Sequence, residues 1–262
     1  MAQRPQLSPS IYDDRGTGTP LMLLHGFPLD RRVWTHQLTG LSGRMRVIAP
    51  DLRGFGRHSN ATAFTLDDLA DDVKGLIDQL GLPKVVLGGL SMGGYVVGAF
   101  AAKYPQALKG MLLIDTKAEA DTAEGRTGRD KMIALVREQG SAAVAEQMLP
   151  KMVAPRALAQ DAPVVAELKA MMAACPADTI AFALAAMRER PDRTIDLARA
   201  AVPTLVIVGE HDAIISPAVA RTMARQIAVA AVCEVPGAGH MSPLEAPQAV
   251  NDAIARFVGG LV

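Results

Sequence analysis

The stretch that decides the fold is Lys84-Val85-Val86-Leu87-Gly88, followed at once by Gly89-Leu90-Ser91-Met92-Gly93. The first five residues predict a buried strand, and an apolar helical pattern runs from Tyr95 to Tyr104. A G-x-S-x-G segment between a strand and a helix predicts a tight turn that holds the serine clear of the sheet. Ser91 is therefore the candidate nucleophile. A nucleotide-binding turn fits less well, because the glycines lack the dinucleotide spacing and no lysine follows them.

Short apolar runs alternate with helical patterns on both sides of this turn. An amphipathic pattern predicts a helix over residues 66–80, with Thr65 and Asp68 as a capping box. Ser216-Pro217 and Ser242-Pro243-Leu244-Glu245 predict two further helix starts, each with a capping serine and an early proline. Because strands alternate with helices, we expect an α/β fold with a mostly parallel sheet and helices on both faces. The other predicted strands are residues 21–24, 46–49, 111–114, 203–208 and 231–235.

Composition excludes several classes of protein. The chain has 262 residues, 50% of them hydrophobic, and 27 basic against 27 acidic side chains. This apolar content excludes a disordered chain, the zero net charge argues against nucleic-acid binding, and no apolar run has the ~18 residues of a membrane span. The first residues lack a secretory apolar core, and two distant cysteines, Cys175 and Cys233, are typical of unpaired thiols in a reducing compartment. We therefore expect a cytoplasmic protein with no membrane or nucleic-acid partner.

The alternation of strands and helices stops between residues 116 and 193. This segment contains no convincing strand pattern, prolines divide it into helical pieces, and its eleven basic residues balance eleven acidic ones. No flexible Gly/Ser tract separates it from its flanks. We expect residues 1–115 and 194–262 to form the core, with residues 116–193 as a helical cap on the sheet.

A serine hydroxyl needs a base to take its proton, so the chain must supply a histidine. In this strand–turn–helix arrangement the acid and the histidine follow the serine along the chain, and of five histidines only His211 and His240 lie after Ser91. His240 is the candidate base, because it lies in a glycine loop after the last predicted strand. His211 directly precedes the candidate acid and is expected to be a loop residue.

The candidate acid is Asp212, which follows the strand at residues 203–208. Its role would be to hold the imidazole of His240 in one tautomer and to stabilise the imidazolium. Asp115, which also ends a strand, and Glu210 are the alternatives.

When a serine attacks a carbonyl carbon, the carbonyl oxygen becomes an oxyanion that needs preorganised hydrogen-bond donors. Two backbone N–H groups are candidates. One belongs to Met92, directly after the nucleophile, and the other belongs to the loop His25-Gly26-Phe27-Pro28 after an early strand. Proline has no N–H, so Phe27 must donate. His25 is expected to order this loop without a chemical role.

With these residues assembled, the chain resembles the α/β-hydrolase superfamily over nearly its full length, and within it the branch of capped esterases and 3-oxoadipate enol-lactonases. The resemblance implies the α/β-hydrolase fold with a helical cap inserted after the sixth strand. It also implies Ser91, Asp212 and His240 as a catalytic triad, and Phe27 and Met92 as backbone oxyanion donors, with no metal or organic cofactor. The matching pieces are residues 25–28, 51–56, 89–93, 209–212 and 239–240.

The expected reaction is hydrolysis of a carboxylic ester or lactone through an acyl-enzyme, with activity rising with pH around a midpoint of about 6 to 7. Alternatives are a 3-oxoadipate enol-lactonase specifically, a cofactor-free perhydrolase or haloperoxidase, carbon–carbon or cyanohydrin cleavage, and a ligand receptor that retains the triad. The balanced charges favour a small neutral substrate, and a homo-oligomer is left open. An acidic enol-lactone would need a cation, for which the insertion offers Arg129, Arg137, Arg156 and Arg188.

One departure from the family pattern affects the substrate. After Gly56, relatives often continue with a small residue or serine, whereas this chain inserts Arg57-His58 before Ser59. Because this loop lies near the entrance in relatives, the departure bears on substrate choice and leaves the triad unaffected.

Overall fold

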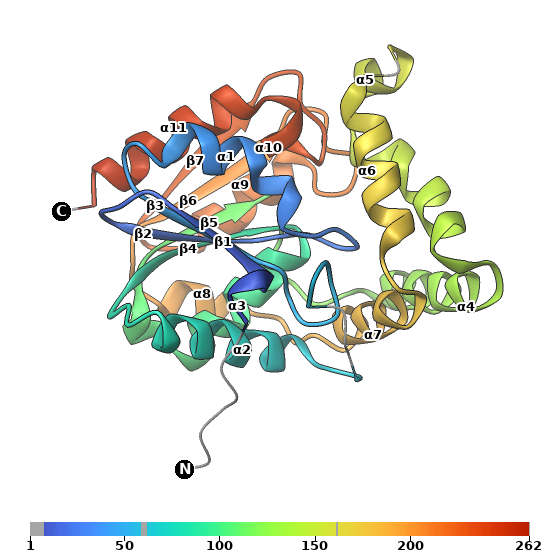
Figure 1. Cartoon of the computed structure of the whole chain (residues 1–262), viewed down its shortest axis with the longest axis horizontal. Coiled ribbons are helices and arrows are strands. Elements are labelled where there is room, and N and C mark those ends of the chain that lie inside the picture. The colour runs from blue at the N-terminus through green and yellow to red at the C-terminus, as the bar shows by residue number, and fades with distance from the viewer. Residues whose placement is uncertain (1–7, 59–61, 161, 262) are drawn as a thin grey trace.

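The centre of the molecule is one sheet, seen in a computed structural model that describes residues 8–58, 62–160 and 162–261. Seven strands of these ranges lie in the order β1-β3-β2-β4-β5-β6-β7 (Figure 1). β1 pairs antiparallel with β3, and every other neighbouring pair is parallel. The strands are β1 Tyr12–Arg15, β2 Pro20–Leu24, β3 Arg46–Pro50, β4 Val85–Leu90, β5 Leu108–Ile114, β6 Thr204–Gly209 and β7 Ala230–Val235.

Successive strand residues point to opposite faces, so the sheet separates two apolar clusters. Met22 and Leu24 belong to one cluster, and Leu21 and Leu23 belong to the other. The first cluster is closed by α2 Leu66–Gln79, α3 Met92–Lys103, α8 Thr194–Arg199 and α9 Pro217–Arg225. The second is closed by α1 Thr35–Leu41, α10 Ser242–Glu245 and α11 Pro247–Gly259, and Figure 1 shows α1 and α11 on the side opposite α2, α3 and α8. The predicted fold class is confirmed.

Helix α2 begins as its sequence predicts. The N–H of Asp68 donates to Thr65 Oγ1 at 3.1 Å, and the N–H of Thr65 donates to Asp68 Oδ2 at 2.8 Å, which completes the capping box. After the helix, Gly81 adopts a φ of +65°, which glycine reaches without strain. Ser216 precedes α9 as predicted, although its side chain makes no capping hydrogen bond.

Residues 116–193, here called the insertion, consist of helices joined by short irregular segments where the structure describes them. They contain α4 Ala123–Met152, which is broken at Gly140, α5 Pro155–Ala159, α6 Pro163–Ala174 and α7 Ala177–Arg188. The Thr179 hydroxyl donates to the carbonyl of Gly54 at 2.9 Å, and the N–H of Asp30 donates to Met171 Sδ at 3.4 Å. Gly54 and Asp30 lie in loops that follow β3 and β2, so the insertion lies over the carboxyl edge of the parallel strands (Figure 1). The division into a core and a separate cap unit stays a prediction.

One detail of the predicted fold was wrong, and one strand was not predicted. The insertion follows β5, the fifth strand of the described ranges, and not the sixth, because the strand count came from the family resemblance rather than from this chain. The antiparallel edge strand β1 was not predicted, because Tyr12-Asp13-Asp14-Arg15 is polar and only partly buried and so lacks an apolar pattern.

No single helix of the described ranges is long and apolar enough to cross a membrane. Helices α6 and α7 reach that length and apolarity only when taken together, and they are bent by 95° at the break between them.

Candidate active site

Ser91 occupies the turn between β4 and α3 in a strained backbone conformation, with φ 52° and ψ −112°. The turn is possible because its neighbours are glycines: a Cβ on Gly89 would lie 2.2 Å from the Gly93 backbone, and one on Gly93 would lie 2.4 Å from the Leu24 carbonyl. The Thr116 hydroxyl donates to the Ser91 carbonyl at 2.8 Å and fixes the turn from the far side. Ser91 is thus held at the start of helix α3, as predicted.

His240 and Asp212 form a buried hydrogen-bonded pair. His240 Nδ1 lies 2.8 Å from Asp212 Oδ2, and both side chains are almost completely buried. Asp212 Oδ1 accepts the N–H groups of Ile214 and Ile215, each at 2.8 Å, so the carboxylate is held from both sides. The two residues come from the loops after β6 and β7, and the structure brings them together as the sequence predicted.

The charges around His240 favour its protonated form. Burial lowers the His240 pKa, but the hydrogen bond and charge of Asp212, together with the charges of Asp115 and Glu245, raise it above 6.5 on balance. Because Nδ1 faces a carboxylate, it carries the proton, and Nε2 is left with the lone pair that a general base needs.

The loop of residues 25–28 lies against the serine. A Cβ on Gly26 would lie 3.4 Å from Ser91 Cβ. Within the described ranges, the backbone N–H groups of Phe27 and Met92 have no hydrogen-bond acceptor, so both are free to bind an incoming oxygen. The Ser91 hydroxyl, which is partly exposed, likewise hydrogen-bonds to none of the described side chains.

His25 orders this loop. Its Nε2 accepts the N–H of Leu52 at 3.0 Å, so its Nδ1 carries the proton and donates to the Gly26 carbonyl at 2.9 Å. The side chain is fully buried, and burial lowers its pKa, which keeps the imidazole neutral.

The alternative acids have other partners. Asp115 Oδ1 accepts the N–H of Gly209 at 2.8 Å, and Oδ2 accepts the Ser242 hydroxyl at 2.6 Å. Burial raises the pKa of Asp115 to about 7. Glu210 is half exposed and accepts the N–H of Gly237 at 2.9 Å. Neither carboxylate hydrogen-bonds to the imidazole of His240.

His211, the other histidine after Ser91, is half exposed, and its Nε2 lies 3.9 Å from Glu210. It contacts neither Asp212 nor Ser91 by hydrogen bond or ion pair, in agreement with its predicted place in a loop.

Ser242 does not have its predicted capping role, and the role of Glu245 was not predicted. Ser242 is the first residue of α10 and not its cap, and its hydroxyl binds Asp115 instead of the helix backbone. Glu245 accepts the N–H of Gly239 at 2.9 Å and that of Ala154, in the insertion, at 2.7 Å. The only signal in the sequence was the position of Glu245 five residues after His240, which does not identify a partner from a distant segment.

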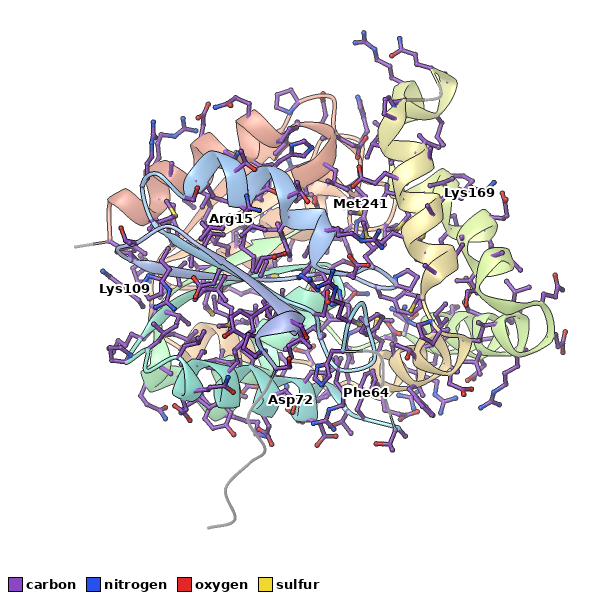
Figure 2. The ribbon with its side chains drawn as sticks, viewed as in Figure 1. Arg15, Phe64, Asp72, Lys109, Lys169 and Met241 are labelled. Atoms are coloured by element: carbon purple, nitrogen blue, oxygen red, sulfur yellow. The ribbon has the colours of Figure 1, made fainter. Side chains whose placement is uncertain are left out.

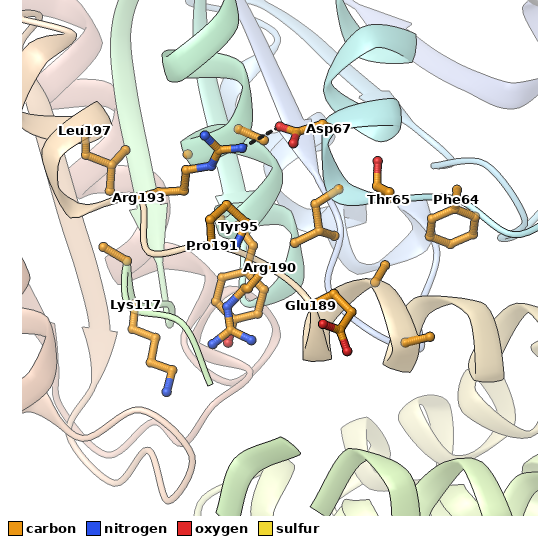
Figure 3. A pocket seen from close by; sticks show the side chains of 17 residues that line it. Phe64, Thr65, Asp67, Tyr95, Lys117, Glu189, Arg190, Pro191, Arg193 and Leu197 are labelled. Carbon is orange, nitrogen blue, oxygen red and sulfur yellow. Dashed lines mark hydrogen bonds and ion pairs between the residues drawn. The ribbon is translucent and has the colours of Figure 1, made fainter. Parts of the chain in front are cut away.

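Two cavities lie near this region, and neither is lined by Ser91, Asp212 or His240. One, of about 270 Å³, lies between α2, α3, α7 and α8; Figure 3 shows the Arg190 guanidinium over the ring of Tyr95, at 4.1 Å from its centroid. The other, of about 450 Å³, adjoins the loop of residues 25–28 and is lined by Pro28, Asp30, Arg31, Asp51, Arg57 and Met171 among others.

The second cavity is lined in part by Gly56 and Arg57, which belong to the loop that departs from the family pattern. Arg57 lines this cavity together with Pro28 and with Met171 of the insertion. Ser59 lies outside the described residues. Figure 2 shows Met241, the residue after His240, between the sheet and helix α6, and Met241 shares a buried cluster with Met171.

No group of three or more His, Cys, Asp or Glu side chains in the described part of the chain is arranged to hold a metal ion.

Comparison with known proteins identifies the family. The model of the alpha/beta hydrolase fold family matches residues 19–247, so the chain belongs to that family. A thermophilic esterase structure from Thermogutta terrifontis is 41% identical, with a TM-score of 0.92 over 95% of this chain and 93% of that one.

Lactonases are similar over most of their length as well. The 3-oxoadipate enol-lactonase 2 of Acinetobacter baylyi is 30% identical over 85% of this chain and 82% of that protein. The crystal structure of the enol-lactonase from Burkholderia xenovorans LB400 is 28% identical, with a TM-score of 0.87 over 95% of each chain. The chain is thus an α/β-family hydrolase with esterase and enol-lactonase homologues, and the predicted resemblance is confirmed.

Proposed function

We propose that the protein is a serine hydrolase that cleaves carboxylic esters or lactones through an acyl-enzyme. The observation that carries this proposal is the buried pair of His240 and Asp212, 2.8 Å apart, at the same sheet edge as a serine in a strained turn. The free N–H groups of Phe27 and Met92 beside that serine complete the set of groups that acyl transfer requires.

In the first step, Ser91 Oγ attacks the carbonyl carbon of the substrate while His240 Nε2 takes the hydroxyl proton. The carbonyl oxygen gains the negative charge and accepts the N–H groups of Phe27 and Met92, the latter at the positive end of helix α3. Asp212 stabilises the imidazolium that forms. When the tetrahedral intermediate collapses, His240 returns the proton to the leaving alcohol oxygen, and the acyl group stays on Ser91.

In the second step, a water molecule takes the place of the alcohol. His240 removes one of its protons, the hydroxide oxygen attacks the acyl carbon, and the same two N–H groups bind the oxyanion. Collapse of this intermediate releases the carboxylic acid and returns the proton to the oxygen of Ser91. No step of this sequence requires a metal or an organic cofactor.

Charge supports neutral esters or lactones as substrates. Of the insertion's candidate cations, Arg129 forms an ion pair with Asp121 at 3.0 Å, and Arg188 pairs with Asp130 and Glu189. The other two, Arg137 and Arg156, are exposed at the surface. None of the four lines either cavity described above. These four residues therefore offer no cation to an acidic enol-lactone; Arg57, which lines the cavity beside Pro28, is the candidate that the acidic substrate would need.

Replacing Ser91 by alanine tests the proposal. We expect kcat for 4-nitrophenyl acetate to fall by several orders of magnitude, because the variant cannot form the acyl-enzyme. Ser216→Ala is the matched control, since Ser216 is exposed and its side chain makes no capping hydrogen bond. Unchanged turnover in Ser91→Ala would contradict the proposal.

Covalent labelling separates an enzyme from a receptor that merely keeps the triad. A fluorophosphonate should label the wild type at Ser91 and leave Ser91→Ala unlabelled. Labelling together with normal ester turnover supports the enzyme, and labelling with negligible turnover of every ester and lactone supports the receptor.

We place the protein in the cytoplasm, a compartment that fits its two unpaired cysteines, Cys175 and Cys233.

A further inference from the structure

Glu245 joins the His240 loop to the insertion. Its Oε1 accepts the N–H groups of Gly239 at 2.9 Å and Met241 at 3.3 Å, the two residues that flank His240. Its Oε2 accepts the N–H of Ala154 at 2.7 Å, just after helix α4 of the insertion ends. One carboxylate therefore binds donors on both sides of the candidate base and a donor 91 residues away in the chain.

The backbones of these two segments are in direct contact. A Cβ on Gly239 would lie 2.4 Å from the nitrogen of Ala154 and 2.5 Å from the carbonyl carbon of Val153, so no larger residue fits there. Val153 and Ala154 are each only 2% exposed. Because water is excluded from this contact, the Glu245 carboxylate is the group that satisfies the three N–H donors.

The geometry points to Glu245 as a positioning residue that holds His240 and the insertion in one fixed arrangement. This inference rests on the proposed function, since it assigns to Glu245 the task of placing the base of that reaction. The ring of His240 is anchored at Nδ1 by Asp212, but its backbone is held through Gly239 and Met241. Motion of the insertion at Ala154 therefore reaches the base through the Glu245 carboxylate as well as through the backbone contact at Gly239.

Glu245 also adds charge near the base. The groups that face His240 are Asp212 after β6, Asp115 after β5 and Glu245 of α10, and each of these carboxylates favours the imidazolium. Loss of the Glu245 charge therefore shifts the acid limb of the pH profile to lower pH, whereas loss of its geometry lowers kcat. The two effects are separable by substitution.

The test compares two variants of Glu245. Glu245→Gln has one acceptor oxygen, which stays with the two donors beside His240, and its NH₂ then opposes the N–H of Ala154. We expect kcat for 4-nitrophenyl acetate to fall about tenfold or more, since a misplacement of about 1 Å can cost ~100-fold. We also expect a lower midpoint of the acid limb and faster hydrogen exchange at the Ala154 amide.

Glu245→Asp keeps the charge but is one methylene shorter, so it cannot reach both segments. It should restore the acid limb toward the wild-type pH and leave kcat low. It is also the second variant by which the inference is judged if Glu245→Gln does not fold. The matched control is Glu210→Gln, because Glu210 also accepts a loop N–H, from Gly237, but does not contact the insertion.

The outcomes are decisive in both directions. Low kcat in both Glu245 variants, with Glu210→Gln at the wild-type value, supports the inference. A kcat within about twofold of wild type in the Glu245 variants, or an equal loss in Glu210→Gln, overturns it. Ser91→Ala is measured alongside: if that variant stays active the proposed function fails, and if only that variant is inactive the inference about Glu245 alone is wrong.

Discussion

Replacing Asp212 by asparagine tests the acid of the proposed triad without changing its shape. Oδ1 of Asp212 accepts two N–H groups, from Ile214 and Ile215, and Oδ2 faces His240 Nδ1 at 2.8 Å. In the variant the amide oxygen must stay with the two backbone donors, so the NH₂ group faces the imidazole. His240 then accepts at Nδ1 and carries its proton on Nε2, where it cannot receive the proton of Ser91.

The size of the effect follows from this change of tautomer. A triad whose histidine is held in the wrong tautomer loses about 10⁴-fold in kcat, which corresponds to about 5.5 kcal/mol of barrier. KM should change little, because Asp212 is buried behind His240. The assay is the initial rate of 4-nitrophenyl acetate hydrolysis at pH 8, normalised to the concentration of folded protein.

Two further variants show whether another carboxylate is the acid. If Asp115 oriented His240, Asp115→Asn and not Asp212→Asn would show the loss of about 10⁴-fold. Glu210→Gln should retain the wild-type rate, because Glu210 is half exposed and binds only Gly237. A loss of less than about tenfold in folded Asp212→Asn would refute the tautomer argument.

Three more predictions concern pH and packing. Burial lowers the His240 pKa, but Asp212, Asp115 and Glu245 together more than offset it, so the acid limb of kcat/KM should have a midpoint above 6.5. A midpoint below 6.5 in a profile measured from pH 5 to 9 would contradict this. Burial raises the pKa of Asp115 to about 7, above its unfolded value of about 3.9, so its stabilising contribution is lost as pH rises through 7. The free energy of unfolding in urea should fall by about 3 kcal/mol between pH 5 and 9 from this group, and Asp115→Asn should flatten that profile; parallel profiles would argue against it. Gly93→Ala places a Cβ 2.4 Å from a β2 carbonyl and should lower Tm sharply, whereas Gly128→Ala, with nothing within 4 Å, should raise it slightly; equal Tm values would show that the turn tolerates a side chain.

The fold could be predicted wherever burial imposes a pattern. Strand β4 and helix α2 are recognisable because one is apolar throughout and the other has an apolar stripe with a capping box. Strand β1 could not be found, because its pairing with β3 is made by backbone groups and its side chains are polar and half-exposed. An edge strand that buries little leaves little signal in the sequence.

The site residues were predicted to the extent that a local motif fixes their place. Ser91 lies in a turn that only glycine neighbours permit. Asp212 and His240 lie in the loops after β6 and β7, of which β6 is apolar and fully buried. The roles of Ser242 and Glu245 could not be derived in this way. A serine and a glutamate three residues apart predict a capping box, whereas here tertiary contacts to Asp115 and Ala154 occupy both side chains.

The parallel sheet explains why the positions of the site residues could be predicted while the contacts of Ser242 and Glu245 could not. All strands that carry the candidate chemistry run in one direction, so the residues after β2, β4, β6 and β7 arrive at one edge whatever their distance in the chain. The shared strand direction therefore brings Phe27, Ser91, Asp212 and His240 to that edge, and no tertiary contact has to be known in advance. Coupling between the edge and the insertion is different, since it depends on which side chain meets the backbone of Ala154. Strand direction does not determine that second kind of contact, which is why the sequence places Asp212 and His240 at one edge but does not reveal the contact of Glu245 with Ala154.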